Sequence, residues 1–187
     1  MFARTERLLL RPAWDEDADA LHAAIGDETV VRNLAKAPWP YRLEDARSFV
    51  GAARDAALPD YLIFARTHGT PRLIGGIGLA REDHGDETGT IELGYWIARP
   101  YWGLGFATEA ARAVVATADH TLRIPRLTAS HFLDNPASRN VLYKLGFRPT
   151  GEVFMRRSVA RRREVACARF VREAGAEGES SNPALAA

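Results

Sequence analysis

Cysteine is almost absent from this chain. Its 187 residues include a single cysteine, Cys167, so an internal disulfide and a cysteine zinc cluster are both excluded. Cys167 stands in an apolar, strand-like run, which is typical of a small buried side chain. The histidines are scattered without metal-ligand spacing, and we therefore predict no metal. They are His22, His68, His84, His120 and His131.

An excess of charge of one sign is also missing. Lys plus Arg number 25 and Asp plus Glu number 24, which leaves a formal net charge of +1. This balance creates no strong global field, so we expect neither nucleic acid nor a membrane as a partner. The apolar run Leu8-Leu9-Leu10 is far too short for a signal-peptide core or a membrane span, which predicts a cytoplasmic protein.

Two nucleophile and nucleotide motifs are absent as well. The sequence contains no G-x-S-x-G elbow and no phosphate loop ending in Gly-Lys-Ser/Thr. This argues against a hydrolase of the first type and a P-loop nucleotidase. The length fits one domain, by the prior of about 100–200 residues per domain. We predict a domain over residues 1–173 and a disordered tail over 174–187, because the tail is small and polar.

Hydrophobic periodicity predicts an alternation of strands and helices. The strand-like runs are Glu6–Arg11, Tyr61–Thr67, Leu73–Arg81, Thr90–Ala98, Arg126–Phe132, Glu152–Arg157 and Glu164–Val171. Helical stripes are expected at Trp14, Ala18, Leu21 and Ile25, over about Glu28 to Ala35, at Ala46, Phe49, Val50, Ala53 and Ala57, over Ala107–Ala118, and over Pro136–Leu145. Short turns around the second to fourth strands imply an antiparallel meander. This order is typical of a mixed α/β domain and not of a doubly wound parallel sheet.

A glycine-bearing turn stands between the fourth strand and a helix. It reads Trp102-Gly103-Leu104-Gly105-Phe106-Ala107. Glycine allows backbone N–H groups to approach a phosphate, and a helix N-terminus attracts negative charge. The turn therefore predicts a phosphorylated ligand, although the two glycines alone fit a tight strand-to-helix connection equally well.

The same segment nearly matches a dinucleotide-binding fingerprint. Thr108 stands where that pattern expects its third glycine or alanine. The pattern also expects an acidic residue about twenty positions later, and the chain has Pro125 there, flanked by Ile124 and Arg126. We therefore rank dinucleotide binding below the family resemblance described next.

Four segments, in chain order, carry a resemblance to a known family. They are Glu6-Arg7-Leu8-Leu9-Leu10-Arg11-Pro12; Pro38-Trp39-Pro40-Tyr41; Gly94-Tyr95-Trp96 through Trp102-Gly103-Leu104-Gly105-Phe106-Ala107-Thr108-Glu109-Ala110; and Asn135-Pro136-Ala137-Ser138-Arg139 through Leu145-Gly146-Phe147. The chain resembles the GNAT superfamily of acyl-CoA N-acyltransferases, most closely its RimJ/RimL branch, which acetylates N-terminal amines of ribosomal proteins. The resemblance implies a mostly antiparallel twisted sheet of about seven strands, flanked by helices and splayed at the acyl-CoA site.

The resemblance also implies where acetyl-CoA binds. Its pyrophosphate would lie on the turn that begins at Trp102 and continues through Gly103, Leu104, Gly105, Phe106, Ala107 and Thr108. Trp102 departs from the Arg or Gln of the wider superfamily. The pantetheine arm would run along the backbone of Tyr95, Trp96 and Ile97, and Asn135 would touch the cofactor while capping the helix that follows it.

Catalysis in this family is direct attack of a neutral amine on the thioester, without a covalent enzyme intermediate. Alternation along Ile91–Ala98 places Glu92 on one face with Gly94 and Trp96, and Glu92 resembles the general base of some members. Its bland alternative is a solvent-facing glutamate. The position of the tyrosine that many members use to protonate the leaving sulfur is Leu142 here, and Tyr143 is rotated about 100° away on a helix. The RimJ/RimL pattern offers Ser138 instead.

Trp39 and Tyr41 are candidates for the acceptor pocket, or else they cover the core. The arginines near the last hairpin could meet an acidic acceptor or ribosomal surface, although a solvated turn is the simpler interpretation; they are Arg156, Arg157, Arg161, Arg162 and Arg163. We expect an acetyl-CoA-dependent N-acetyltransferase acting on a primary amine, for which a protein N-terminus is the first choice. The alternatives are a small amine such as a polyamine, amino sugar or amino acid, a longer acyl donor, and a non-catalytic CoA-binding module. Either a monomer or a homodimer is compatible with the sequence.

Overall fold

The protein is described here from a computed structural model covering residues 2–67, 69–82 and 90–175. His68 and His84 of the metal prediction, and residues 176–187 of the predicted tail, lie outside these described residues. In the described ranges no helix has the length and apolar character needed to cross a membrane. The same ranges contain no group of three or more His, Cys, Asp or Glu side chains that could hold a metal ion.

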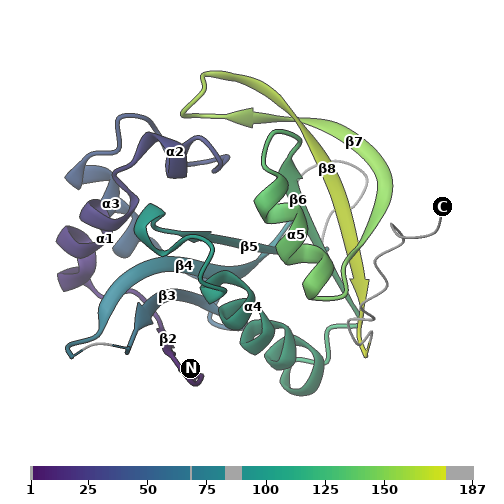
Figure 1. Ribbon diagram of the computed structural model, residues 1–187, viewed down its shortest axis with the longest axis horizontal. Helices are drawn as coiled ribbons and strands as arrows, with labels where there is room; N and C mark the ends of the chain where they lie inside the picture. The colour runs from purple at the N-terminus through teal and green to yellow at the C-terminus, as the bar shows by residue number, and fades with distance from the viewer. Residues whose placement is uncertain (1, 68, 83–89, 176–187) are drawn as a thin grey trace.

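Eight strands form one sheet in the order β1-β2-β3-β4-β5-β6-β8-β7 (Figure 1). Their bounds are β1 Ala3–Arg4, β2 Leu8–Arg11, β3 Asp60–Ala65, β4 Arg72–Arg81, β5 Ile91–Ile97, β6 Arg126–Phe132, β7 Arg148–Ser158 and β8 Arg163–Glu173. All neighbours are antiparallel except β5 and β6. The expected mixed fold and antiparallel meander are confirmed. The extra strand is β1, whose two residues are too few to show a period.

Helices cover both faces of the sheet. They are α1 Ala18–Ile25, α2 Glu28–Val31, α3 Leu43–Val50, α4 Phe106–Ala116 and α5 Pro136–Lys144, with short 3₁₀ turns at Asp15–Asp17 and Arg99–Tyr101 and a π-helical turn at Thr117–Thr121. One hydrophobic cluster joins α4 and α5 to the sheet, and a second joins α1, α2 and α3 to it. In β3, Ile63 belongs to the first cluster while Leu62 and Phe64 belong to the second, because side chains alternate between the faces.

The first helix begins later than its apolar stripe predicts. Trp14 is extended, with φ of −119° and ψ of 160°, and lies outside the helix. Its backbone N–H donates to Asp17, and its ring lies under the guanidinium of Arg11, 3.7 Å from the ring centre. Arg11 and Asp17 form a buried ion pair of 2.6 Å. This pairing, together with an edge-on contact to the Phe2 ring, holds Trp14 outside the helix.

The second and third helices are shorter than predicted. α2 ends at Val31, four residues before Ala35, and the Asn33 side chain donates to the carbonyl of Thr29. α3 ends at Val50, so Ala53 and Ala57 are not part of it and their inclusion in the stripe was wrong. The guanidinium of Arg54 donates to the carbonyls at the end of α3, at Phe49 and Val50. These side chains satisfy carbonyls that a longer helix would have used.

Glycines in β4 allow β5 to present a tryptophan. A Cβ at Gly76 would stand 2.6 Å from Nε1 of Trp96, and one at Gly75 would stand 2.3 Å from the Trp96 carbonyl oxygen. Both distances are shorter than real Cβ contacts, so a larger residue at Gly76 would displace the indole and one at Gly75 would press on the β5 backbone. The indole of Trp96 consequently lies against β4 and faces the second cluster.

Candidate active site

The sheet opens between β5 and β6. These parallel strands pair at Ile91, Glu92 and Leu93, and beyond that point β5 continues to Ile97 while its partner diverges. On its other side, β5 bonds to β4 through alternate residues, as the Ala98 N–H to Ile74 carbonyl bond of 2.7 Å shows. The alternation of an antiparallel pair directs the backbone N–H and C=O of Tyr95 and Ile97 away from β4 and into the opening. An extended ligand can therefore take the place of a missing strand.

The glycine turn borders this opening. Gly103 and Gly105 have φ of 76° and 81°, a left-handed backbone that glycine adopts without strain. A Cβ at Gly103 or at Gly94 would meet nothing within 4 Å. Gly105 is the N-cap of α4, so the free N–H groups of its first turn face the same space. This cradle fits a phosphate group without any side-chain cation.

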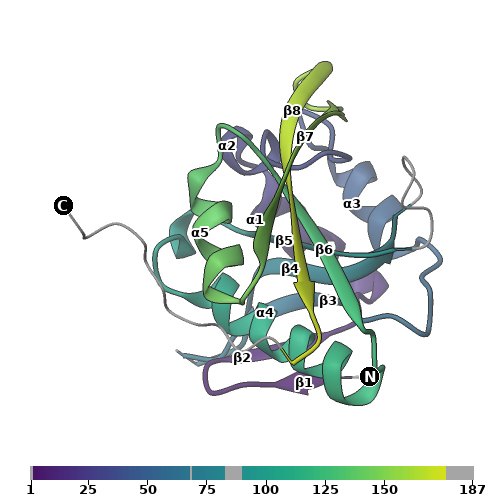
Figure 2. The same ribbon diagram turned by 90° about the vertical axis from the view of Figure 1, so that its right-hand side faces the viewer.

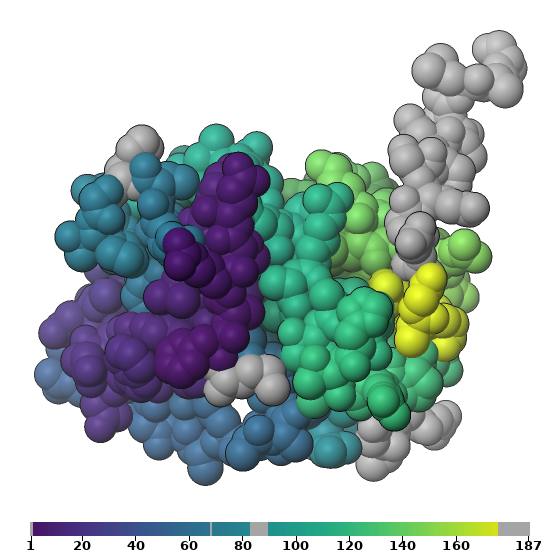
Figure 3. Space-filling view, turned by 90° about the horizontal axis from the view of Figure 1, so that it is seen from below, coloured from purple at the N-terminus to yellow at the C-terminus, as the bar shows by residue number. Residues whose placement is uncertain are grey.

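Arg7 holds the turn from behind. Its guanidinium donates to Glu109 at 2.7 Å and to the Leu104 carbonyl at 3.1 Å, and lies 4.5 Å from the centre of the Phe106 ring. Burial alone would raise the pKa of Glu109, but hydrogen bonds from Thr5 and Arg7 outweigh it and hold that pKa below its usual range. Figure 3 shows the purple N-terminal segment beside the green-teal surface of α4. Arg7 belongs to the first segment of the family resemblance, but no sequence pattern predicted its contact with the glycine turn.

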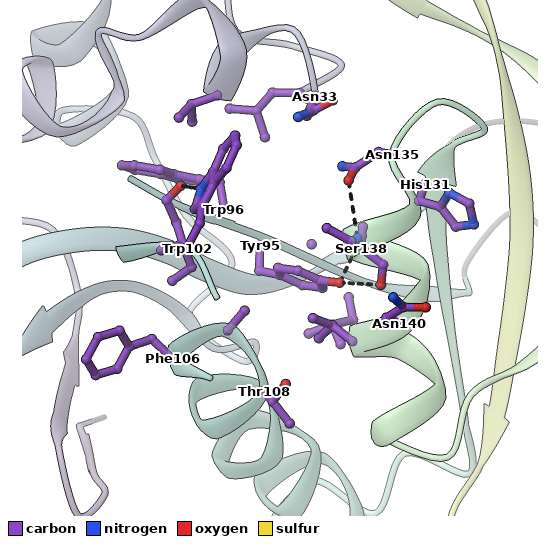
Figure 4. A pocket seen from close by; sticks show the side chains of 18 of the residues that line it. Asn33, Tyr95, Trp96, Trp102, Phe106, Thr108, His131, Asn135, Ser138 and Asn140 are labelled. Carbon is purple, nitrogen blue, oxygen red and sulfur yellow. Dashed lines mark hydrogen bonds between the residues drawn. The ribbon is translucent and has the colours of Figure 1, made fainter. Parts of the chain in front are cut away.

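A cavity of about 510 Å³ runs along the opening (Figure 4). The expected donor-site residues line it, apart from Leu104, whose carbonyl binds Arg7. The side chain of Trp102 crosses one end of the cavity and donates from Nε1 to the Ile97 carbonyl at 2.6 Å. This bond occupies one of the backbone acceptors that face the opening. The expected residues in the lining are Glu92, Tyr95, Trp96, Ile97, Trp102, Gly103, Gly105, Phe106, Ala107, Thr108, Asn135 and Ser138.

The N-terminus of α5 forms one wall of the cavity. Oδ1 of Asn135 accepts from the Ser138 N–H at 3.2 Å, and Pro136 takes the first helical position, which confirms the predicted cap. Oη of Tyr95 lies 2.8 Å from Oγ of Ser138. Leu142 is buried in the core, whereas Tyr143 is 48% exposed, packs edge-on against Phe170 and lies outside the lining. The helix therefore turns Ser138, and not Tyr143, toward the cavity.

Glu92 is neither free nor solvent-facing. Its carboxylate accepts from Ser130 at 2.6 Å and from Arg156 at 2.9 Å. Arg156 also binds Glu82, whose side chain is 2% exposed. The network joins β5, β6 and β7 to Glu82, the residue that follows β4, at the bottom of the opening. Sequence reasoning missed the role of Arg156 because it was read as one of several arginines on a solvated hairpin.

The end of the cavity near the α2 segment differs from what we expected of an acceptor pocket. Neither Trp39 nor Tyr41 lines it: Tyr41 is 8% exposed in the second cluster, and Trp39 packs against that cluster. The lining at this end comes instead from the segment that contains α2, at Val30, Asn33, Leu34 and Ala35. No motif marked these four residues.

The β7–β8 hairpin reaches across to the α2 segment (Figures 1 and 2). The Val159 N–H donates to the Ala35 carbonyl at 2.9 Å, and Nε of Arg161 donates to the Arg32 carbonyl at 2.8 Å. Asp134, in the loop between β6 and α5, accepts from both Arg161 and Arg32. Hydrogen bonding by Arg161 is the main reason that the pKa of Asp134 is lowered. We call this contact of hairpin, loop and α2 segment the bridge.

A sheet splayed beside a glycine turn at a helix N-terminus, with a cavity along the opening, is the arrangement expected of an acyltransferase of the resembled family. A family model for the acetyltransferase (GNAT) domain matches residues 7–148. The chain thus belongs to the GNAT family of N-acetyltransferases. The dinucleotide-binding alternative is wrong, because the turn lies in a mostly antiparallel sheet and not in a doubly wound one.

Individual relatives agree with this assignment. The "Uncharacterized N-acetyltransferase YoaA" of Bacillus subtilis is 32% identical over 159 residues, covering 79% of this chain and 82% of the relative. A putative ribosomal-protein-serine acetyltransferase from Vibrio cholerae shares the fold, with a TM-score of 0.75 at 22% identity over 92% of this chain and 97% of that one. So does the Microcin C7 self immunity acetyltransferase MccE, solved in complex with acetyl-CoA and AMP, with a TM-score of 0.73 at 18% identity over 90% and 93%.

Proposed function

We propose that residues 1–173 form a RimJ/RimL-like domain that acetylates a protein N-terminal α-amine from acetyl-CoA. The observation that carries this choice is the state of Glu92. Among the described residues that line the cavity it is the one carboxylate, and Arg156 and Ser130 already bind it. The cavity therefore offers neither a strong base nor an acidic path for a polycation.

The acceptor's own basicity decides how much help it needs. An α-amine with pKa near 8 is roughly a tenth neutral at pH 7, whereas a lysine-type amine near 10.4 is neutral below one part in a thousand. An α-amine can thus attack after losing its proton to water, with Glu92 accepting through a bridging water. A polyamine would need both deprotonation and several carboxylates to neutralise its charge.

The donor is held mainly by backbone in this proposal. The pyrophosphate lies on the N–H groups of the Gly103–Thr108 turn, and the pantetheine amides pair with the backbone of Tyr95 and the N–H of Ile97. Acetyl-CoA supplies an activated acyl group, and the chain orients it. Ser138 then donates a hydrogen bond to the leaving sulfur. A thiol with a pKa of about 8.5 or slightly higher needs little more than such a bond.

Acetyl-CoA-dependent thiol release tests the acceptor. The panel contains Ser-, Ala- and Met-initiated peptides, the same peptides with blocked N-termini and one free lysine, spermidine, an aminoglycoside and free amino acids. We expect turnover with free N-termini and at least tenfold less with the blocked peptides. Selective turnover of spermidine or the aminoglycoside would transfer the function to small amines. Binding of CoA without turnover of any amine would favour the non-catalytic alternative.

A further inference from the structure

The side chain of Tyr95 meets the start of α5 inside the cavity. Oη lies 2.8 Å from Oγ of Ser138 and 3.1 Å from the Ser138 carbonyl oxygen (Figure 4). Burial raises the pKa of Tyr95 to about 12. The phenol therefore stays neutral and keeps its proton throughout the range in which a thiol ionises. The sequence analysis expected Tyr95 to contact acetyl-CoA only through its backbone and gave its side chain no role.

The two hydroxyls can share their protons in two ways. When Tyr95 donates to the Ser138 carbonyl, its oxygen can accept the single proton of Oγ, and Ser138 has none left to give. When Tyr95 donates to Oγ, the Ser138 proton is free to point into the cavity. A hydroxyl that accepts a hydrogen bond is also a better donor, because chained bonds polarise one another. The second arrangement makes Ser138 a stronger donor than an isolated serine.

We propose that Tyr95 is a positioning residue for the leaving group, acting through Ser138. This rests on the role of Ser138 in the proposed function. As the amine nitrogen bonds to the carbonyl carbon, the C–S bond breaks and its electron pair goes to sulfur. Oγ–H of Ser138 then turns to the thiolate, and Oη–H of Tyr95 turns from the backbone carbonyl to Oγ. The ammonium proton leaves to water, and the thiolate takes a proton from water on release.

A binding measurement tests this without any acceptor. Donors that stabilise a thiolate lower the pKa of the CoA thiol in the complex, so CoA affinity should rise as pH increases from 6.5 to 10. Acetyl-CoA has no free thiol and provides the reference. The other titratable or charged residues in the lining are Glu92, Tyr101, His131, Lys144 and Arg156, and they face CoA and acetyl-CoA alike. The ratio of the two affinities therefore isolates the thiol.

We expect the ratio of CoA affinity to acetyl-CoA affinity to rise with pH in the wild type. In Tyr95→Phe this rise should be smaller by a factor of roughly three to ten, which is the range of one hydrogen bond. Tyr143→Phe, a change of the same kind on the surface of α5, should match the wild type. Equal pH profiles for Tyr95→Phe and the wild type would overturn the proposal. This readout does not depend on which amine is acetylated, so its failure is distinct from failure of the proposed acceptor.

A double-mutant cycle supplies the second readout. With any amine that turns over, Tyr95→Phe should lower kcat about threefold to tenfold and leave the KM for acetyl-CoA unchanged. Ser138→Ala should lower kcat further, and the double variant should match Ser138→Ala alone, because Tyr95 acts only through that hydroxyl. Multiplicative effects, or a raised KM in Tyr95→Phe, would show that Tyr95 supports packing or contacts the donor directly. Melting temperatures of all variants exclude a loss of fold.

Discussion

The two ends of the cavity are built by different means. The proposed donor end consists mainly of backbone groups within residues 95–108, from β5 through the glycine turn to the start of α4, and is completed by Asn135 and Ser138. At the acceptor end, side chains are joined by ion pairs between distant segments. Glu92 and Arg156 are 64 positions apart, and Arg32 and Asp134 are 102 apart. In the proposed function, the donor is therefore held mainly by main-chain groups and the acceptor meets side chains.

The largest effect is expected from a substitution at the donor end. Gly105→Val should abolish measurable acetyl-CoA binding, because φ of 81° disfavours a branched side chain and the added Cβ would stand 3.5 Å from the Arg7 guanidinium that holds the turn. Isothermal titration calorimetry checks the expectation. Gly151→Val is the matched control, since Gly151 has φ of 86° with open space around it on β7. Equal loss of binding in both variants would assign the effect to strain alone.

A medium effect is expected where the two ends meet. Glu92→Gln should lower turnover, by up to the ~10² that general-base catalysis contributes at its lower limit, and leave acetyl-CoA affinity nearly unchanged. Steady-state kinetics measures the turnover, and calorimetry measures the acetyl-CoA affinity. Glu152→Gln removes a half-exposed partner of Arg169 outside the cavity and should be silent. A Glu92→Gln variant with full turnover would remove Glu92 from proton transfer and leave it as a partner of Arg156.

The smallest effect should come from the bridge. Asp134→Asn weakens the contacts to the exposed Arg32, a pair worth about 0–1 kcal/mol, and to Arg161, whose side chain is only 8% exposed. We expect a twofold to threefold change in the acceptor KM at low salt, a smaller one in 0.5 M NaCl, and no change in the KM for acetyl-CoA. Because the pKa of Asp134 is lowered in the fold, the stabilisation of the bridge by its carboxylate is present near neutral pH. This stabilisation is lost as pH falls through the lowered pKa. Asp55→Asn, at the exposed pair with Arg81, is the control.

Sequence reasoning succeeded where the information was local. β6 has the predicted bounds Arg126–Phe132, and the cap of α5 by Asn135 is as expected. The buried alanine and valine stripe of α4 is also confirmed at Ala110, Ala111 and Val114. Each of these depends on a few neighbouring residues. The side-chain hydrogen bonds that end α3, by contrast, come from Arg54 beyond the helix, and periodicity carries no signal for them.

The acceptor end shows what periodicity alone could have recovered. In β7, Phe154, Arg156 and Ser158 alternate inward, whereas Met155 and Arg157 are exposed. Applying this alternation to the hairpin would have separated Arg156 from its neighbours before the structure was known. The pairing of Arg156 with Glu82 would still not have been predicted from the sequence. The lining around Asn33 depends on tertiary packing and had no local signal.

Arg7 ties the edge of the sheet to the phosphate cradle, and this connection works in both directions. Its bonds to Glu109 and Leu104 hold the turn, so any event that orders the turn also favours the docked N-terminal segment. Binding free energies are reciprocal: if the docked segment strengthens donor binding, donor binding stabilises the docked segment by the same factor. Amide hydrogens of Thr5 to Leu8, far along the chain from the cradle, should therefore exchange more slowly once the donor is bound. The first strands of the sheet thus report on the occupancy of a site that they do not line.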